Sequence, residues 1–162
     1  MRIFLGSDHA GFELKKALIQ FLQQAGHHPE DMGPHTFDPQ DDYPDYVLPV
    51  AEMVAADSES RGIVLGASGQ GEAVVANRVR GVRAVVYYGP NPVTAESSNP
   101  HEILVLSREH NDANVLSLGA KFLTSDTARE AVRLWLRTPF SGEERHIRRL
   151  SKIVSIEDDI KN

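Results

Sequence analysis

The stretch that decides the fold of this 162-residue chain is Gly62-Ile63-Val64-Leu65-Gly66-Ala67-Ser68-Gly69-Gln70-Gly71-Glu72. Its first five residues form a short apolar run, which indicates a buried strand. The glycines at 66, 69 and 71 then allow the backbone to turn sharply, and the residues through Asn77 predict a short helix. A strand, a glycine-rich turn and a helix in this order are typical of an α/β protein with a mainly parallel sheet.

Apolar runs and helical patterns alternate along the rest of the chain and extend this prediction. Further strands are expected at residues 3–5, near His28, at 83–88 and at 115–118, and further helices over about 14–25, 46–56, 125–138 and 143–160. Pro49 fits the helix over 46–56 only in its first turn. Residues 33–44 and 89–101 are expected to be loops, the second unusually long. No repeat or linker interrupts the pattern, so we expect one domain over 1–162.

The composition narrows the function classes. The formal net charge of −6 argues against a nucleic-acid footprint spread over the whole surface. The absence of cysteine removes disulfides, thiolate metal sites and a cysteine nucleophile. No apolar run approaches the roughly 18 residues of a membrane helix, and the first residues are too polar for a signal-peptide core. No His, Asp and Glu cluster has metal-ligand spacing. We therefore expect a soluble, cytoplasmic protein without a metal.

The glycine-rich turn has the chemistry of an anion cradle. Backbone N–H groups at the start of a helix, together with the helix dipole, favour negative charge, either a phosphate or an oxyanion that develops during a reaction. The candidate binding residues are Ala67, Ser68, Gly69, Gln70 and Gly71. The spacing matches neither G-x-G-x-x-G nor a P-loop, and Gln70 replaces the glycine that a nucleophile elbow requires.

Glu72 follows this cradle and is a candidate base. Acidic residues are common in the first turn of a helix for electrostatic reasons alone, so its position has a purely structural explanation as well. The neighbouring cradle favours the catalytic interpretation.

Two further segments carry candidate site residues next to strands. Asp8 and His9 follow the first strand, at the carboxyl edge where open α/β sheets bind ligands, although Asp8 could simply cap the next helix. His110 and Asn111 precede the fifth strand in a polar segment. His110 could act as an acid or base or lie exposed on the surface.

Arg145 and Arg149 are four residues apart in the last predicted helix and so share one face. Two guanidinium groups that converge on one point make a phosphate clamp. The alternative is that this helix face is exposed to solvent and that Glu143 and Glu144 balance the positive charge of the two arginines.

Taken in order, these segments resemble the ribose 5-phosphate isomerase B family, which includes the galactose 6-phosphate isomerase subunits. The motifs that carry the resemblance are Ser7-Asp8-His9-Ala10-Gly11-Phe12, Asp42-Tyr43-Pro44, Gly66 to Glu72 with Ala76-Asn77, Arg108-Glu109-His110-Asn111, and Arg145-His146 with Arg149. The resemblance implies a three-layer α/β/α sandwich, Rossmann-like, around a five-stranded parallel sheet. It also implies a homodimer or homotetramer whose active sites are shared between subunits.

The resemblance also implies roles for individual residues. Family members use either a cysteine at the position of Gly66 or a glutamate at that of Glu72, and this chain looks like the glutamate branch. Glu72 would move a proton between C1 and C2 of the sugar, and His110 would help to open the ring. The turn from Ala67 to Gly71, with Asn111, would hold the enediolate oxygens. Asp8 and His9 would contact the sugar, and Arg145 and Arg149 would bind the phosphate. No cofactor or metal is implied.

Two departures from the family pattern concern the substrate. Lys121 stands where the glutamate branch usually has an arginine that helps to bind phosphate, so this contact becomes a point charge. The segment over 89–106 is also longer than expected for the family, and it leads into His110.

The leading hypothesis is an aldose–ketose isomerase of ribose 5-phosphate and ribulose 5-phosphate, an enzyme of the pentose phosphate pathway. One alternative is an isomerase of a six-carbon sugar phosphate, such as allose or galactose 6-phosphate. Another is a phosphosugar-binding protein without turnover. Each implies a small phosphorylated sugar as partner, with no nucleic acid and no membrane.

Overall fold

The computed structural model describes residues 1–90 and 99–159, in which strands and helices alternate. The elements are β1 (Arg2–Ser7), α1 (Phe12–Gln24), β2 (His28–Asp31), α2 (Pro44–Ala56), β3 (Arg61–Gly66), α3 (Gln70–Ala76), β4 (Ala84–Tyr87), α4 (Glu102–Glu109), β5 (Val115–Gly119), α5 (Ser125–Arg137) and α6 (Glu144–Asp159). A 3₁₀ turn, Ala120–Phe122, follows β5.

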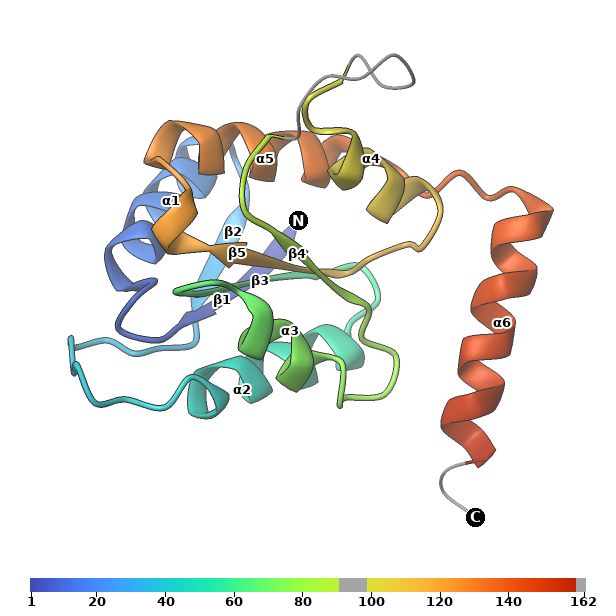
Figure 1. Cartoon of the computed structure of the whole chain (residues 1–162), viewed down its shortest axis with the longest axis horizontal. Helices are drawn as coiled ribbons and strands as arrows, with labels where there is room; N and C mark the ends of the chain where they lie inside the picture. Colours follow the sequence, from blue (N-terminus) through green and yellow to red (C-terminus); the bar gives the residue numbers. More distant parts are fainter. Residues whose placement is uncertain (91–98, 160–162) are drawn as a thin grey trace.

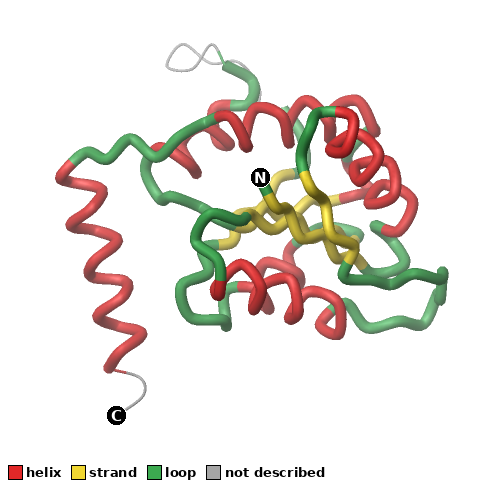
Figure 2. Tube along the Cα trace, turned by 180° about the vertical axis from the view of Figure 1, so that it is seen from behind, coloured by secondary structure: helices red, strands yellow, loops and turns green. Residues whose placement is uncertain are grey.

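The five strands form one sheet in the order β2-β1-β3-β5-β4, and every neighbouring pair is parallel. Helices α1, α4 and α5 cover one face of the sheet, and α2 and α3 cover the other (Figure 1). Figure 2 shows the same layers from behind, with the strands between two sets of helices. The prediction of an α/β sandwich around a five-stranded parallel sheet is confirmed.

Both faces of the sheet are buried, as a parallel sheet between helices requires. Side chains alternate between the faces, so Ile3 and Leu5 pack with Trp135 of α5, whereas Phe4 packs with Val50 of α2. All five of these side chains are fully buried. The short apolar runs in the sequence are therefore strands whose two sides contribute to two separate cores.

Two details differ from the sequence prediction. Helix α2 begins at Pro44, so Pro49 lies inside the helix rather than in its first turn. Helix α4, over Glu102–Glu109, was not predicted at all. Residues 89–90 and 99–101 are irregular, as expected for the long loop, and the rest of the predicted loop, 91–98, lies outside the described residues.

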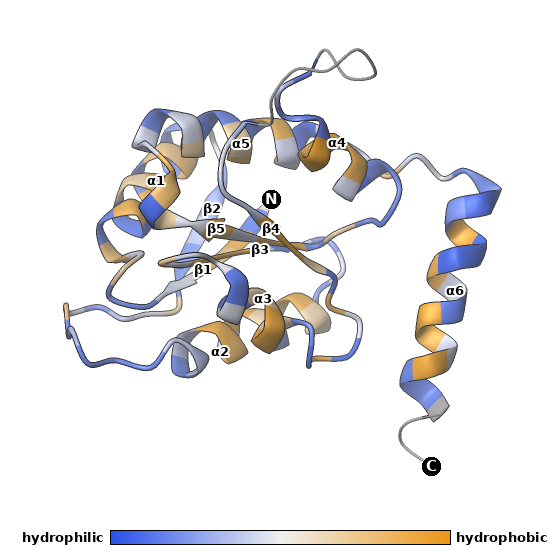
Figure 3. Ribbon diagram, in the orientation of Figure 1, coloured by the Kyte–Doolittle hydropathy of each residue, from blue (hydrophilic) through white to orange (hydrophobic). Residues whose placement is uncertain are grey.

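Helix α6 lies outside the layers of the sandwich, on the side of the sheet where β5 begins (Figure 1), and its last turn pairs with Arg80 through Glu157 and Asp158. Apolar and polar residues alternate along it (Figure 3), and Ile147, Ile153, Val154 and Ile156 are exposed. Among the described helices, none is long and apolar enough to cross a membrane.

The packing of α2 on β1 depends on the missing side chain of Gly6. A Cβ there would lie 2.5 Å from the carbonyl oxygen of Tyr46 and 2.9 Å from a methyl group of Val50. We expect Gly6→Ala to lower the free energy of unfolding by about 1–3 kcal/mol, because overpacking displaces α2. Gln20→Ala, on the exposed side of α1, should change it by less than about 0.5 kcal/mol. Denaturant unfolding measures both, and equal values would show that α2 has room to move.

Candidate active site

The carboxyl ends of β1, β3 and β5 bring one group of the predicted site residues together. Ser7 at the end of β1 pairs with Leu65 of β3, and Gly66 pairs with Gly119 at the end of β5. The segments that follow these strands therefore meet at one edge of the sheet. They carry Asp8, His9, the turn from Ala67 to Gly71, Glu72 and Lys121.

The glycine-rich turn is anchored to β5 and to the residues after it. Gly69 has a left-handed backbone, with φ of 76°, and its carbonyl oxygen accepts a hydrogen bond of 2.6 Å from the Ser117 hydroxyl. The backbone N–H of Lys121 donates to the Ala67 carbonyl at 3.1 Å. The sequence prediction placed Ser117 in a strand but gave it no role in the site, since a serine within an apolar strand gives no indication that it fixes a distant turn.

Glu72 is buried, with 4% of its surface exposed. Its carboxylate occupies the space beside Gly66, where any Cβ would overlap it. Burial raises the pKa of Glu72 above its ordinary value, and the negative charge of Asp8 raises it further. A carboxyl group in such a place can take up and release a proton at a higher pH than an exposed glutamate.

Asp8 shapes the turn before α1 rather than capping the helix. Its Oδ1 accepts hydrogen bonds from the backbone N–H groups of Ala10 at 2.9 Å and Gly11 at 3.2 Å. The helix itself starts one residue later and has Gly11 as its N-cap, without a side-chain cap. The expectation that Asp8 could cap this helix is therefore wrong in detail.

His9 is held by Asp41, which the sequence prediction missed. The Asp41 carboxylate lies 2.7 Å from Nδ1 of His9 and accepts a hydrogen bond of 3.0 Å from its backbone N–H. The hydrogen bond to Asp41 raises the pKa of His9, which favours a positive charge at this edge. Asp41 lies in a loop that carries several aspartates, so sequence alone did not distinguish it from its neighbours.

The loop that carries Asp41 is fixed by Lys15, whose side chain is fully buried. The Lys15 ammonium donates to the Pro34 carbonyl at 2.8 Å and pairs with Asp31. Asp31 also accepts a hydrogen bond of 2.9 Å from the backbone N–H of Gly33. The ion pair between the buried Lys15 and the partly exposed Asp31 therefore determines where the loop after β2 begins.

Tyr43, near the end of the same loop, contacts the glycine-rich turn. A Cβ at Gly71 would lie 2.7 Å from the Cζ of the Tyr43 ring. The absence of a side chain at residue 71 therefore lets the aromatic ring pack directly against the turn.

A second group of predicted residues lies at the opposite edge of the sheet. His110 and Asn111 follow α4 and precede β5, and the Asn114 carbonyl accepts a hydrogen bond from Gly62 at the beginning of β3. The part of β3 between Gly62 and Gly66 rises by about 13 Å. Within one chain, the structure therefore does not bring His110 and Asn111 to the edge that carries Glu72.

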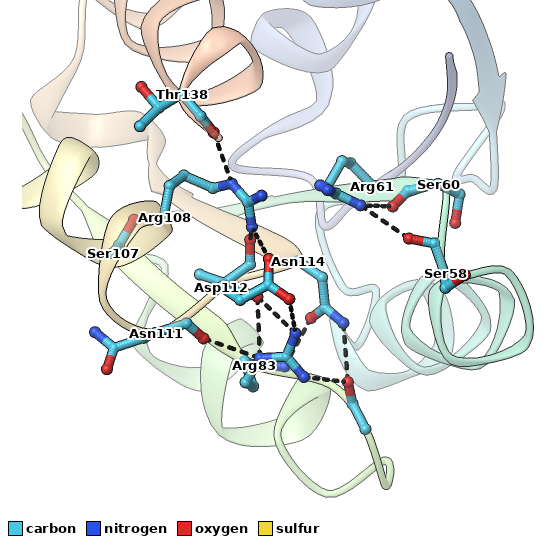
Figure 4. A network of polar contacts seen from close by, with 12 residues as sticks. Ser58, Ser60, Arg61, Arg83, Ser107, Arg108, Asn111, Asp112, Asn114 and Thr138 are labelled. Carbon is cyan, nitrogen blue, oxygen red and sulfur yellow. Dashed lines mark hydrogen bonds and ion pairs between the residues drawn. The ribbon is translucent and has the colours of Figure 1, made fainter. Parts of the chain in front are cut away.

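A network of arginines fixes the backbone around His110 and Asn111 (Figure 4). The Asp112 carboxylate pairs with Arg83 and with Arg108, both at 2.8 Å. Arg83 also donates to the Asn111 carbonyl at 2.9 Å. Asp112 has a left-handed backbone, with φ of 44°, a conformation that side chains disfavour. The two ion pairs offset the cost of this conformation and hold the turn.

Arg145 and Arg149 project from the beginning of α6 and are exposed. Nε of Arg145 donates to the Glu143 carboxylate at 2.7 Å. The ring of His146, between the two arginines in sequence, stacks on the His110 ring. The two arginines therefore belong to the same side of the molecule as His110.

The predicted site thus divides into two groups. Asp8, His9, Ala67 to Gly71, Glu72 and Lys121 lie at the carboxyl edge, and His110, Asn111, Arg145 and Arg149 lie at the amino edge and on α6. Among residues 1–90 and 99–159, no group of three or more His, Asp or Glu side chains could hold a metal ion.

Comparison with known proteins gives one consistent result. A family profile described as Ribose/Galactose Isomerase matches residues 3–153. The chain is 40% identical over 157 residues to ribose-5-phosphate isomerase B from Mycolicibacterium paratuberculosis, covering 97% of this chain and 92% of that protein.

Solved structures agree with this match. The structure of ribose-5-phosphate isomerase B from Mycoplasma genitalium with bound ribulose-5-phosphate superposes with a TM-score of 0.87 at 35% identity, covering 97% of this chain and 96% of that one. The enzyme from Clostridium thermocellum gives 0.86 at 39% identity, with 99% of both chains covered. By sequence and by fold, this chain belongs to the ribose/galactose isomerase family.

Proposed function

We propose that this chain interconverts ribose 5-phosphate and ribulose 5-phosphate, with Glu72 as the base. The observation that carries the proposal is the buried Glu72 carboxylate, with its raised pKa, next to a glycine-rich turn. Similarity to ribose-5-phosphate isomerases B over nearly the whole chain supports the choice of substrate.

The reaction moves one proton between adjacent carbons. In the open-chain aldose, the Glu72 carboxylate removes the proton from C2, and the electron pair forms the C1–C2 double bond of an enediolate. Glu72 then delivers the proton to C1, and the proton of the C2 hydroxyl passes to the C1 oxygen, so that C2 becomes the ketone and C1 carries the hydroxyl. Backbone N–H groups of the turn, from Ala67 to Gly71, stabilise the negative oxygens of the enediolate.

The space beside Gly66 supports assignment to the glutamate branch of the family. The cysteine of the other branch would stand at residue 66, where even a Cβ overlaps the Glu72 carboxylate. The same space can therefore hold either a glutamate side chain from residue 72 or a cysteine side chain from residue 66. In this chain the Glu72 carboxylate occupies it.

The second group of residues acts at the ring oxygen and the phosphate. His110 donates a proton to the ring oxygen as the bond from C1 to that oxygen breaks, and the C1 hydroxyl gives up its proton to water, so that the cyclic sugar opens to the aldehyde. Arg145 and Arg149 bind the phosphate, and their binding energy holds C2 near the base. Asp8, His9, Asn111 and Lys121 complete the contacts with the substrate, Lys121 as a point charge near the turn.

These roles require two chains, because His110 and Glu72 lie at opposite edges of one sheet. The chain therefore works as a homodimer in which the amino edge and α6 of one subunit complete the carboxyl edge of the other. The exposed isoleucines of α6 support this arrangement, since a helix that lies off its own sandwich can bury them against a second subunit.

Glu72→Gln should lower kcat for ribose 5-phosphate by about 10²–10⁴-fold, because the amide cannot accept the C2 proton. Glu52→Gln, the same change on the exposed side of α2, should leave kcat unchanged. Formation of ribulose 5-phosphate by purified protein measures both, with allose 6-phosphate as a second substrate. Turnover of allose 6-phosphate but not of ribose 5-phosphate would support the alternative that the protein is an isomerase of a six-carbon sugar phosphate. If the folded protein binds ribose 5-phosphate but does not convert it, the result would support the alternative of a phosphosugar-binding protein without catalytic activity.

Mixing two inactive variants tests the shared site. Glu72→Gln and His110→Gln subunits, unfolded and refolded together in equal amounts, should recover about a quarter of the wild-type turnover. Half of the dimers are then mixed, and each mixed dimer has one of its two sites intact. Each variant refolded alone is the control. No recovery from dimers shown to be mixed would place Glu72 and His110 of one site on the same chain.

The raised pKa of Glu72 predicts the acid side of the pH profile. Because the base must be ionised, kcat/KM should rise with pH around a midpoint above the ordinary glutamate value of about 4.3. Asp8→Asn should move this midpoint to lower pH, since it removes a negative charge that raises the pKa of Glu72. The asparagine oxygen can still accept the hydrogen bond from Ala10. A midpoint that stays in place or rises would show that Glu72 does not govern this limb.

A further inference from the structure

We propose that His146 is a positioning residue for His110, whose ring it holds by stacking in the orientation that opens the cyclic sugar. The inference rests on the proposed function, in which His110 protonates the ring oxygen. His146 itself does not touch the substrate. Its role is to fix where His110 points and where the first turn of α6 lies.

The geometry of the two rings carries the proposal. Their centroids are 4.2 Å apart, and their planes are inclined by 15°. His146 is almost fully buried, with 1% of its surface exposed, whereas His110 is half-buried at the end of α4. One ring is therefore buried, and the other, stacked on it, is partly exposed to solvent.

The atoms of His146 have no other evident use. Its Nε2 is buried and makes no hydrogen bond within residues 1–90 and 99–159, and Oε2 of Glu143 lies 3.9 Å from it. A buried nitrogen without a hydrogen bond costs stability. A large apolar side chain would fill the same space without this cost. Because the Nε2 atom of His146 forms no hydrogen bond within the described part of the chain, we infer that the flat aromatic face of the ring is what matters at this position.

The surroundings of His146 favour the neutral form of its ring. Burial lowers the pKa of His146, and His110, Arg145 and Arg149 lower it further, against the opposing effect of Glu143. A cation over a neutral aromatic face is attracted to it, so His146 supports the acid form of His110.

The same stack connects the acid to the phosphate clamp. The segment before α6 is fastened to α4 through its backbone, where Ser141 N–H donates to the Glu109 carbonyl at 3.2 Å. Nε of Arg108 donates to the Thr138 carbonyl, also at 3.2 Å. His146 adds the contact that fixes a side chain of α6 against the acid. His110, Arg145 and Arg149 are thereby held as one unit.

Two substitutions separate stacking from mere filling of space. His146→Leu occupies the buried volume without an aromatic ring, and we expect kcat for ribose 5-phosphate to fall about tenfold to a hundredfold, as for a misplaced catalytic group. His146→Phe keeps the ring and should restore kcat to within about threefold of wild type. His28→Ala, an exposed histidine of β2, is the control. Circular dichroism and the dimer mass of each variant establish that it is folded and assembled.

An isotope effect identifies the step that the leucine slows. With ribose 5-phosphate deuterated at C2, the kinetic isotope effect on kcat reports how far removal of the C2 proton limits the rate. In His146→Leu, slow ring opening should reduce this effect towards unity, whereas His146→Phe should keep the wild-type value. A general loosening of the protein would lower kcat without this selective loss.

Nuclear magnetic resonance of the free protein tests the stack without turnover. The ring protons of His110, assigned by comparison with His110→Gln, should be shifted upfield by the neighbouring ring in wild type and in His146→Phe, and should lose this shift in His146→Leu. This measurement still decides whether His146 orients His110 if ribose 5-phosphate is not a substrate, in which case the proposed function fails separately.

Three results would overturn the inference. The first is a His146→Leu protein with wild-type kcat and isotope effect. The second is a His146→Phe protein as slow as His146→Leu, because the imidazole nitrogen rather than the ring face would then be needed. The third is a His110 resonance that the leucine substitution leaves unchanged.

Discussion

All five strands run in the same direction, and the rest of the molecule depends on this constraint. A chain that leaves a parallel strand at one edge must return to the other edge before the next strand can begin. Helices make these returns, and they cover both faces of the sheet in doing so (Figure 1). The same constraint sorts side chains by their place in the sequence. Residues after a strand, such as Asp8 and Lys121, gather at one edge, and residues before a strand, such as His110, gather at the other.

The sequence predicts this fold well where apolar patterns are regular. Strands β1, β3, β4 and β5 were found because each is a short apolar run, and α1 and α2 because their apolar residues recur at helix spacing, whereas β2 (His28–Asp31) has no such run. Helix α4 was missed because Ile103, Leu104, Val105 and Leu106 form an unbroken run without helical periodicity. In the structure, Ile103 and Leu106 are exposed, whereas Leu104 is buried. The positions of apolar residues therefore did not show which face of α4 packs against the sheet. Lys15 was missed for the opposite reason, because a buried lysine interrupts the apolar face of a helix.

The candidate site could be predicted only in part. Glycines permit backbone conformations that other residues disfavour, so the cradle in this strand–turn–helix segment and the adjoining Glu72 were recognisable in the sequence. Asp41 and Ser117 gain their importance from hydrogen bonds to residues 32 and 48 positions away, and no local pattern contains such a partner. The stack between His110 and His146 depends likewise on how α6 leaves the sandwich, which tertiary packing determines.

The overlap between residue 66 and the Glu72 carboxylate restricts how this enzyme can evolve. With Glu72 in its proposed role, a mutation of Gly66 to cysteine alone would displace the base before the new side chain had a suitable environment. Shortening residue 72 first would remove the base altogether. Each single mutational step therefore passes through an impaired protein, so an ancestor could exchange one base for the other only when both codons changed or when a duplicated gene relaxed selection. The two proposed positions for a base are in this sense separate adaptive peaks, divided by the volume of a single side chain.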